Sequence, residues 1–79
     1  MMKVTVKYFG LVAEAIGTNE EVLNLTAPTT AHELKLKCLN PHGIMDQESI
    51  QVAVNQNLDE SIILKEGDEV ALLPPFAGG

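Results

Sequence analysis

The chain has 79 residues, a hydrophobic fraction of 46% and a net charge of −6. This length supports one small domain, and this hydrophobic fraction indicates a folded rather than a disordered chain. Because the charge is acidic and the only cationic side chains are five lysines, we expect neither nucleic acid nor an anionic membrane as a partner. The acidic surface suits steering toward a basic protein, although solubility alone also accounts for it.

A single cysteine excludes an internal disulfide. The sequence shows no secretory signal pattern, and its longest apolar runs are too short to span a bilayer. We therefore expect a cytoplasmic protein. With no tryptophan and only three aromatic residues in all, its core must be built from aliphatic side chains.

The first half of the chain predicts two strands and two helices. Alternation over residues 2–9 predicts a strand, whose core face consists of Met2, Val4, Val6 and Tyr8. Residues 10–17 suit a short helix that ends at Gly17, after which residues 18–21 form a turn. Residues 22–26 then predict a second strand.

Thr30 and Glu33 have the spacing of a capping box, which predicts a helix from there to about Leu39. Glu33 and Lys37 are four residues apart and favour an ion pair on its exposed side. Its buried face is expected to carry Ala31, Leu34, Cys38 and Leu39.

The second half predicts strands and turns. Residues 49–55 alternate as a strand, and 56–57 turn the chain. Residues 62–64 form a short apolar strand, Gly67 lies in a tight turn, and 69–73 form the last strand. With one long helix, the predicted fold is α+β, a mixed sheet covered on one face by that helix. Residues 1–73 form this domain and 74–79 a tail.

The tail differs from the domain in composition. Pro74 and Pro75 end the preceding strand and keep the chain extended. Phe76 is a large apolar residue outside any element, and Gly78 and Gly79 have no side chain to obstruct a narrow channel. Six extended residues reach at most roughly 20 Å, enough to enter another protein's pocket. The alternative is an ordinary frayed chain end.

Nothing within the domain indicates catalysis. Cys38 invites a nucleophile hypothesis, but its place on the inward helix face favours a small core residue. His32 and His42 have no second ligand at metal spacing, and the carboxylates lie in turns without calcium-loop spacing, so no metal site is predicted. Any chemistry is therefore expected at the carboxylate of Gly79, which ATP can activate as an acyl-adenylate.

Several motifs together resemble those of the molybdopterin synthase small-subunit family. The members of this family are ubiquitin-like sulfur carriers with the β-grasp fold. The motifs are Val-Ala-Val-Asn-Gln at 52–56, Gly-Asp-Glu-Val-Ala at 67–71, and Pro-Pro-Phe-Ala-Gly-Gly at 74–79, with Val4, Phe9 and residues 14–17 near the start. Two regions depart from the family: Ala13 replaces a frequent arginine, and residues 40–48 carry no family signature.

The resemblance implies a mechanism. A ubiquitin-activating-type adenylyltransferase uses ATP to adenylate Gly79, and a sulfur donor protein with a persulfide converts it to a thiocarboxylate. The tail then inserts into the large synthase subunit through Pro75, Phe76, Ala77 and Gly78. There it gives its sulfur to cyclic pyranopterin monophosphate.

The resemblance also implies partners. Large and small subunits form a heterotetramer, with the catalytic side chains on the large subunit and no cofactor bound to the small one. Phe9, Leu58 and Phe76 are expected to contact the partner, although Phe9 also suits packing under the next segment. Three alternatives remain: a sulfur carrier for thiamine or cysteine synthesis, a ubiquitin-like modifier joined to lysines, and an interaction module with an inert tail.

Overall fold

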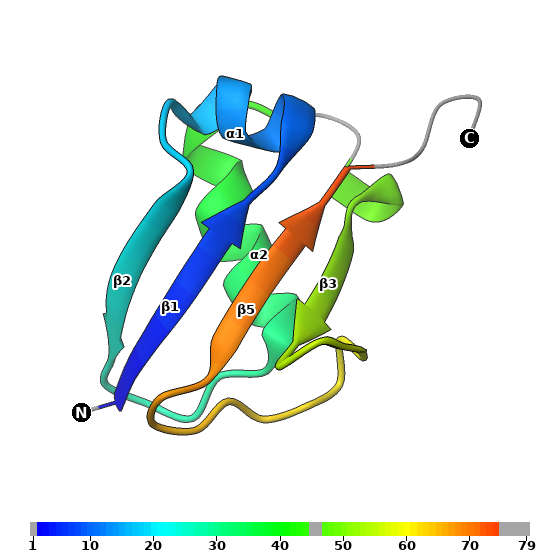
Figure 1. Ribbon diagram of the computed structural model, residues 1–79. Helices are drawn as coiled ribbons and strands as arrows, with labels where there is room; N and C mark the ends of the chain where they lie inside the picture. The colour runs from blue at the N-terminus through cyan, green and yellow to red at the C-terminus, as the bar shows by residue number, and fades with distance from the viewer. Residues whose placement is uncertain (1, 45–46, 75–79) are drawn as a thin grey trace.

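The computed structural model describes residues 2–44 and 47–74 (Figure 1). Its elements in chain order are β1 (Met2–Tyr8), α1 (Gly10–Ile16), β2 (Glu20–Leu25), α2 (Ala31–Leu39), two 3₁₀ turns (Asn40–His42 and Gln47–Ser49), β3 (Gln51–Val54), β4 (Asn57–Leu58) and β5 (Glu69–Leu73).

The strands form one sheet in the order β2-β1-β5-β3-β4. The two central strands, β1 and β5, are parallel, and every other pair is antiparallel. In Figure 1, α2 crosses the rear face of this sheet, and the front face carries no helix of the described chain. The predicted α+β arrangement, a mixed sheet with one main helix on one face, is confirmed.

The core lies between α2 and the sheet. Strand alternation directs every second residue of β1 and β5 toward α2. The residues buried there include Val4, Val6, Tyr8, Leu34, Leu39, Val70 and Leu72. This confirms the core face predicted for the first strand. Each fully buried aliphatic side chain stabilises the fold by about 1.5–3 kcal/mol.

The capping box at the start of α2 is confirmed. Thr30 Oγ1 accepts the Glu33 amide at 3.1 Å, and Glu33 Oε1 accepts the Thr30 amide at 2.9 Å. The expected ion pair between Glu33 and Lys37 is wrong, because no such pair occurs among the described residues. The Glu33 carboxylate turns back to Thr30 instead.

Strands β1, β2 and β3 each end one residue before the predicted end, and two predicted strand starts are also wrong. Strand β2 begins at Glu20, not at Val22, because Glu20 and Glu21 extend the ladder by pairing with Lys7 and Val6. Strand β3 begins at Gln51, because Gln47–Ser49 form a 3₁₀ turn. In each case, pairing or local turn geometry overrides the intrinsic pattern.

The predicted short strand at residues 62–64 is also wrong. The turn after β3 consists of Asn55 and Gln56, with φ of 50° and 74°, so that residues 57–58 become β4. Residues 62–64 instead run beside the start of α2, where Thr30 and Ile63 form an isolated bridge. This segment pairs with the helix cap rather than with the sheet.

The helices of the described residues are α1, α2 and short 3₁₀ turns, and none is long and apolar enough to cross a membrane.

Candidate functional site

Strand β5 leads directly to the tail. Its outward residues are Glu69, Ala71 and Leu73, while Val70 and Leu72 are buried. Pro74 follows and lies against Gly10, where an added Cβ would be 3.0 Å from Pro74 Cγ. Gly10 has a φ of +54°, which glycine adopts without steric cost. The start of α1 therefore contacts the base of the tail.

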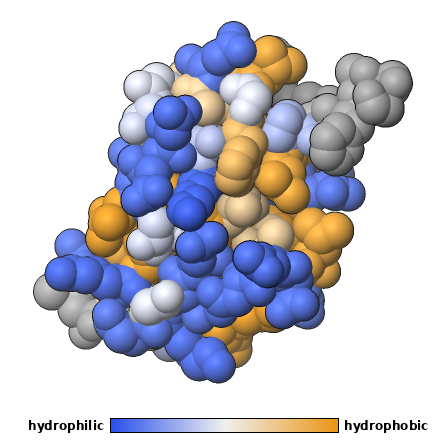
Figure 2. All heavy atoms as spheres, viewed as in Figure 1, coloured by the Kyte–Doolittle hydropathy of each residue, from blue (hydrophilic) through white to orange (hydrophobic). Residues whose placement is uncertain are grey.

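An apolar hollow lies on the sheet face opposite α2. We call it the outer hollow; it has a volume of about 350 Å³ and is lined by Phe9, Ala53, Gln56, Leu58, Glu69, Ala71 and Leu73. Figure 2, which views this face, shows apolar side chains gathered over β5 and β3. Phe9 and Leu58 are 45% and 63% exposed, so this surface is open to a partner.

The strand register explains the shape of the outer hollow. Ala53 lies opposite Ala71 on β5 and opposite Leu58 on β4, so these three side chains form one row across the sheet. The two alanines make a low floor, and Leu58 stands at its edge. Phe9 continues the extended backbone of β1 with a φ of −126°. Its side chain therefore shares the outward face.

One ion pair lies beside the outer hollow. Lys7 Nζ is 3.5 Å from Glu69 Oε1, and both side chains are partly exposed. Lys7 stands opposite Ala71, at the other end of the row from Leu58. Such a pair adds little stability. Its charges are instead available to orient a partner against the apolar floor.

The structure brings Phe9 and Leu58 together, as a common partner surface requires. The other predicted site residues (Pro75, Phe76, Ala77, Gly78 and Gly79) lie outside the described residues. Sequence reasoning missed Ala53, Ala71 and Leu73. The alternation of the last strand was the available signal for Ala71 and Leu73, because it places both opposite the buried Val70 and Leu72.

Cys38 is a buried free cysteine, as its helix position predicted. Burial is the main cause that raises the pKa of its thiol above the ordinary value. The neighbouring Tyr8 hydroxyl donates to Glu21 Oε1 at 2.6 Å, and burial followed by this bond raises the pKa of Tyr8. A thiol held in its neutral form is a poor nucleophile.

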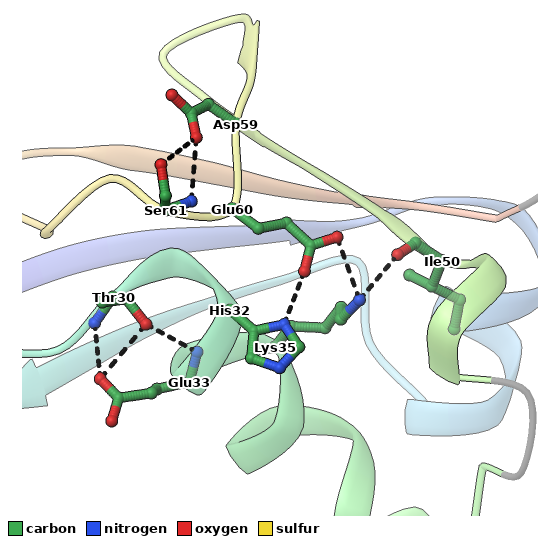
Figure 3. A network of polar contacts seen from close by, with 8 residues as sticks. All are labelled: Thr30, His32, Glu33, Lys35, Ile50, Asp59, Glu60 and Ser61. Atoms are coloured by element: carbon green, nitrogen blue, oxygen red, sulfur yellow. Dashed lines mark hydrogen bonds and ion pairs between the residues drawn. The ribbon is translucent and has the colours of Figure 1, made fainter.

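A polar network joins α2 to two distant segments (Figure 3). The buried Lys35 ammonium donates to the Ile50 carbonyl at 3.1 Å and to Glu60 Oε2 at 3.2 Å. His32 Nδ1 lies 2.6 Å from Glu60 Oε1. Among the described residues, no three metal-binding side chains form a group that could hold an ion. The network links α2 to the residue before β3 and to Glu60.

Comparison with known proteins gives three findings. The sequence profile of the ThiS family matches residues 6–79. The molybdopterin synthase sulfur carrier subunit of Mycobacterium tuberculosis is 39% identical and aligns over all of both chains. The putative molybdopterin converting factor subunit 1 of Pyrococcus furiosus superposes with a TM-score of 0.79 at 26% identity, covering 96% of this chain and all of that one.

A fourth comparison is with a complex. The structure of subunits 1 and 2 of the molybdopterin-converting factor from Helicobacter pylori contains a chain that matches with a TM-score of 0.63 at 26% identity. It covers 99% of this chain and all of that one. The shared fold is the ubiquitin-like β-grasp, as the motifs implied. The resemblance drawn from the motifs is confirmed, and this chain belongs to the ThiS family.

Proposed function

We propose that this chain is the sulfur carrier subunit of a molybdopterin synthase. The observation that carries the proposal is the position of the outer hollow: its wall residue Leu73 is followed at once by Pro74, where the tail begins. A partner that covers the hollow is thus placed to receive the tail. The names of the full-length relatives support this function.

The proposed chemistry takes place at Gly79. Its carboxylate attacks ATP at the α-phosphorus, which forms an acyl-adenylate and releases pyrophosphate. The terminal sulfur of a donor persulfide displaces AMP, and a thiol cleaves the resulting acyl disulfide to leave a thiocarboxylate. The loaded tail then gives its sulfur to cyclic pyranopterin monophosphate. The described domain supplies the surface that positions this tail.

The partners follow from this chemistry. An adenylyltransferase of the ubiquitin-activating type binds ATP and loads the tail, so the carrier needs no cofactor of its own. The large synthase subunit covers Phe9 and Leu58, receives residues 75–79 and supplies the catalytic side chains. The complex of subunits 1 and 2 from Helicobacter pylori supports a large-subunit partner. We propose a cytoplasmic heterotetramer of two large and two small subunits.

The test is the intact mass of the full chain after incubation with ATP, its adenylyltransferase and a persulfide donor. A gain equal to one oxygen replaced by sulfur, located in the C-terminal peptide, is expected. The loaded chain mixed with large subunit and cyclic pyranopterin monophosphate should then yield molybdopterin. Loading without molybdopterin would indicate a carrier for another pathway. Lysine-linked conjugates would indicate a ubiquitin-like modifier. An unchanged mass in the presence of an active adenylyltransferase would indicate an interaction module with an inert tail.

A further inference from the structure

Strand β2 forms one edge of the sheet. Within residues 2–44 and 47–74 it pairs only with β1. An edge strand presents main-chain donors and acceptors to any extended chain that approaches it. Which residues of β2 do so follows from the hydrogen bonds of β1.

Odd-numbered residues of β1 direct their main-chain groups toward β5. The Thr5 amide donates to the Asp68 carbonyl at 3.0 Å, and the Lys3 carbonyl accepts the Gly67 amide at 2.8 Å. The even-numbered Tyr8 donates to the Asn19 carbonyl at 2.9 Å, on the opposite side. In a strand, the N–H and C=O of one residue point to the same side, and successive residues alternate.

This alternation decides the orientation of β2. Val22 lies opposite Thr5, and Asn24 lies opposite Lys3. The main-chain groups of Thr5 and Lys3 point toward β5, so these residues form non-hydrogen-bonded pairs with Val22 and Asn24. Val22 and Asn24 therefore direct their own N–H and C=O groups away from the sheet.

One end of this edge is already occupied. The Thr18 hydroxyl donates to the Glu20 carbonyl at 3.3 Å, which provides a local partner for that outward group. Val22 and Asn24 have no such side-chain partner among the hydrogen bonds of the described chain. Two adjacent outward residues thus offer two donors and two acceptors, the spacing to which a further strand bonds.

A cavity lies beside the same edge, between β2 and α2. It has a volume of about 220 Å³, and its lining includes Glu21, Leu23, Leu25, Lys37, Pro41 and His42. Side chains of an added strand would alternate across the edge, and every second one would face this cavity. Leu23, Leu25 and Pro41 give it an apolar part that suits an aliphatic side chain, while Glu21, Lys37 and His42 make the rest of its wall polar.

We propose that the free edge of β2 binds an extended, basic segment of another protein by strand addition, with one aliphatic side chain in this cavity. Charge decides the partner. A second copy would bring another net charge of −6 and its own Glu20 and Glu21 to this edge. A segment whose lysine or arginine lies beside Glu20 and Glu21, away from the Lys37 ammonium that also lines the cavity, is attracted by these carboxylates.

This site is independent of the proposed sulfur-carrier function. Strand β2 is at the opposite edge of the sheet from β4, which carries Leu58 of the outer hollow. A ligand on β2 therefore leaves the outer hollow and the tail base uncovered. Sulfur loading and peptide binding at β2 can be measured separately, so a negative result for one proposal does not refute the other.

The first test titrates the ¹⁵N-labelled full chain with the acetylated and amidated peptide Lys-Val-Lys-Leu-Lys-Val-Lys. We expect saturable amide shifts confined to residues 20–25 and 37–42. Amide hydrogen exchange should slow at Val22 and Asn24 but not at Leu23, which already faces β1. The same peptide with glutamate in place of lysine should not bind. Absence of shifts at Val22 and Asn24, or shifts centred on Leu58, would overturn the proposal.

The second test uses matched variants. Val22→Pro removes an outward donor, and proline is tolerated at edge positions whose N–H faces solvent. It should weaken peptide binding at least tenfold, whereas Val22→Ala, which keeps the N–H, should bind as the unaltered chain does. Glu20→Lys, which leaves the backbone intact, should also weaken binding. Sedimentation of the chain alone should show a monomer, and a dimer abolished by Val22→Pro would overturn the choice of partner.

Discussion

Asn55 and Asp68 bond to each other through their side chains, with 3.0 Å between Asn55 Nδ2 and Asp68 Oδ1. Asn55 Oδ1 also accepts the Glu69 amide at 3.0 Å, and Asp68 Oδ2 accepts the Lys65 amide at 2.8 Å. The turn after β3 is thereby fastened to the turn before β5. Two of the motifs that revealed the family are thus one structural junction, at the end of β5 away from the tail.

Replacing Asn55 with alanine should lower stability by about 1–3 kcal/mol, because the buried Asp68 loses a donor and a residue that tolerates a φ of 50° is removed. Urea unfolding measures the loss. Asn55→Gly removes the same side chain without the backbone penalty, so it should lose less. Sulfur loading of folded protein should be unchanged for both. An unaltered unfolding midpoint for Asn55→Ala would contradict the junction.

Leu58→Ala should weaken binding to the large subunit roughly tenfold, because a large exposed side chain at the edge of the outer hollow loses its apolar contact. Phe9→Ala should have a similar effect. Isothermal titration measures both. Ile63→Ala is the matched control, since Ile63 is 60% exposed and Leu58 63%, but Ile63 lies beside the start of α2. Equal binding by Leu58→Ala and Ile63→Ala would exclude the hollow as the interface.

Gly79→Leu should abolish sulfur loading, because the proposed reaction passes the terminal carboxylate through a narrow channel to ATP and a branched side chain would obstruct it. Its unfolding curve should match that of the unaltered chain. Phe76→Ala should load normally but bind the large subunit more weakly, since its proposed role is to anchor the tail. Intact mass measures sulfur loading and titration measures binding to the large subunit, so together they distinguish the effects of the two variants. Normal loading of Gly79→Leu would refute the role of an unhindered terminus.

The sequence predicted those features that depend on neighbouring residues. Alternation identified the core face of β1 and the whole of β5, and residue spacing identified the capping box of α2. The predicted position of β4 was wrong because the turn after β3 consists of Asn55 and Gln56, while residues 62–64 pair with the helix cap. The predicted start of β2 was wrong because it depends on the register between strands. That register is set by pairs such as Lys7 with Glu20, which lie far apart in sequence.

In the candidate site too, the sequence indicated single residues but not the features that depend on how the strands are aligned. Phe9 and Leu58 stood out singly as apolar residues in polar surroundings, but the alanine floor between them exists only once β3, β4 and β5 are aligned. Likewise, Lys35 has no local signal of burial. Its ammonium is enclosed because the Ile50 carbonyl and Glu60 come from segments 15 and 25 residues away.

Cys38 should react slowly with thiol reagents at neutral pH, because burial raises the pKa of its thiol and excludes the reagent. Urea-unfolded protein provides the fast reference in the same assay. Cys38→Ala should cost about 1 kcal/mol of stability through the lost packing and should load sulfur at the normal rate. A loading defect in folded Cys38→Ala would restore the nucleophile hypothesis.

Glu60 should make stability depend on acid pH. Its hydrogen bond with His32, and then its contacts with Lys35, hold the pKa of this carboxyl below the usual range, although partial burial opposes them. Because the folded-state pKa is depressed, the stabilisation is present above the unfolded value of about 4.3 and is lost as pH falls through the folded value.

The measurement compares urea unfolding of the unaltered chain and Glu60→Gln from pH 7 to pH 3. At pH 7, Glu60→Gln should be less stable by about 1–3 kcal/mol, because the buried Lys35 ammonium loses its charged partner. This difference should begin to shrink as pH falls below about 4.3, where the unfolded chain starts to bind a proton at this carboxyl, and should shrink further as pH falls through the depressed folded-state pKa. Glu48→Gln is the control, since Glu48 takes no part in the network. A difference that stays constant down to pH 3 would show that the charge of Glu60 does not stabilise the fold.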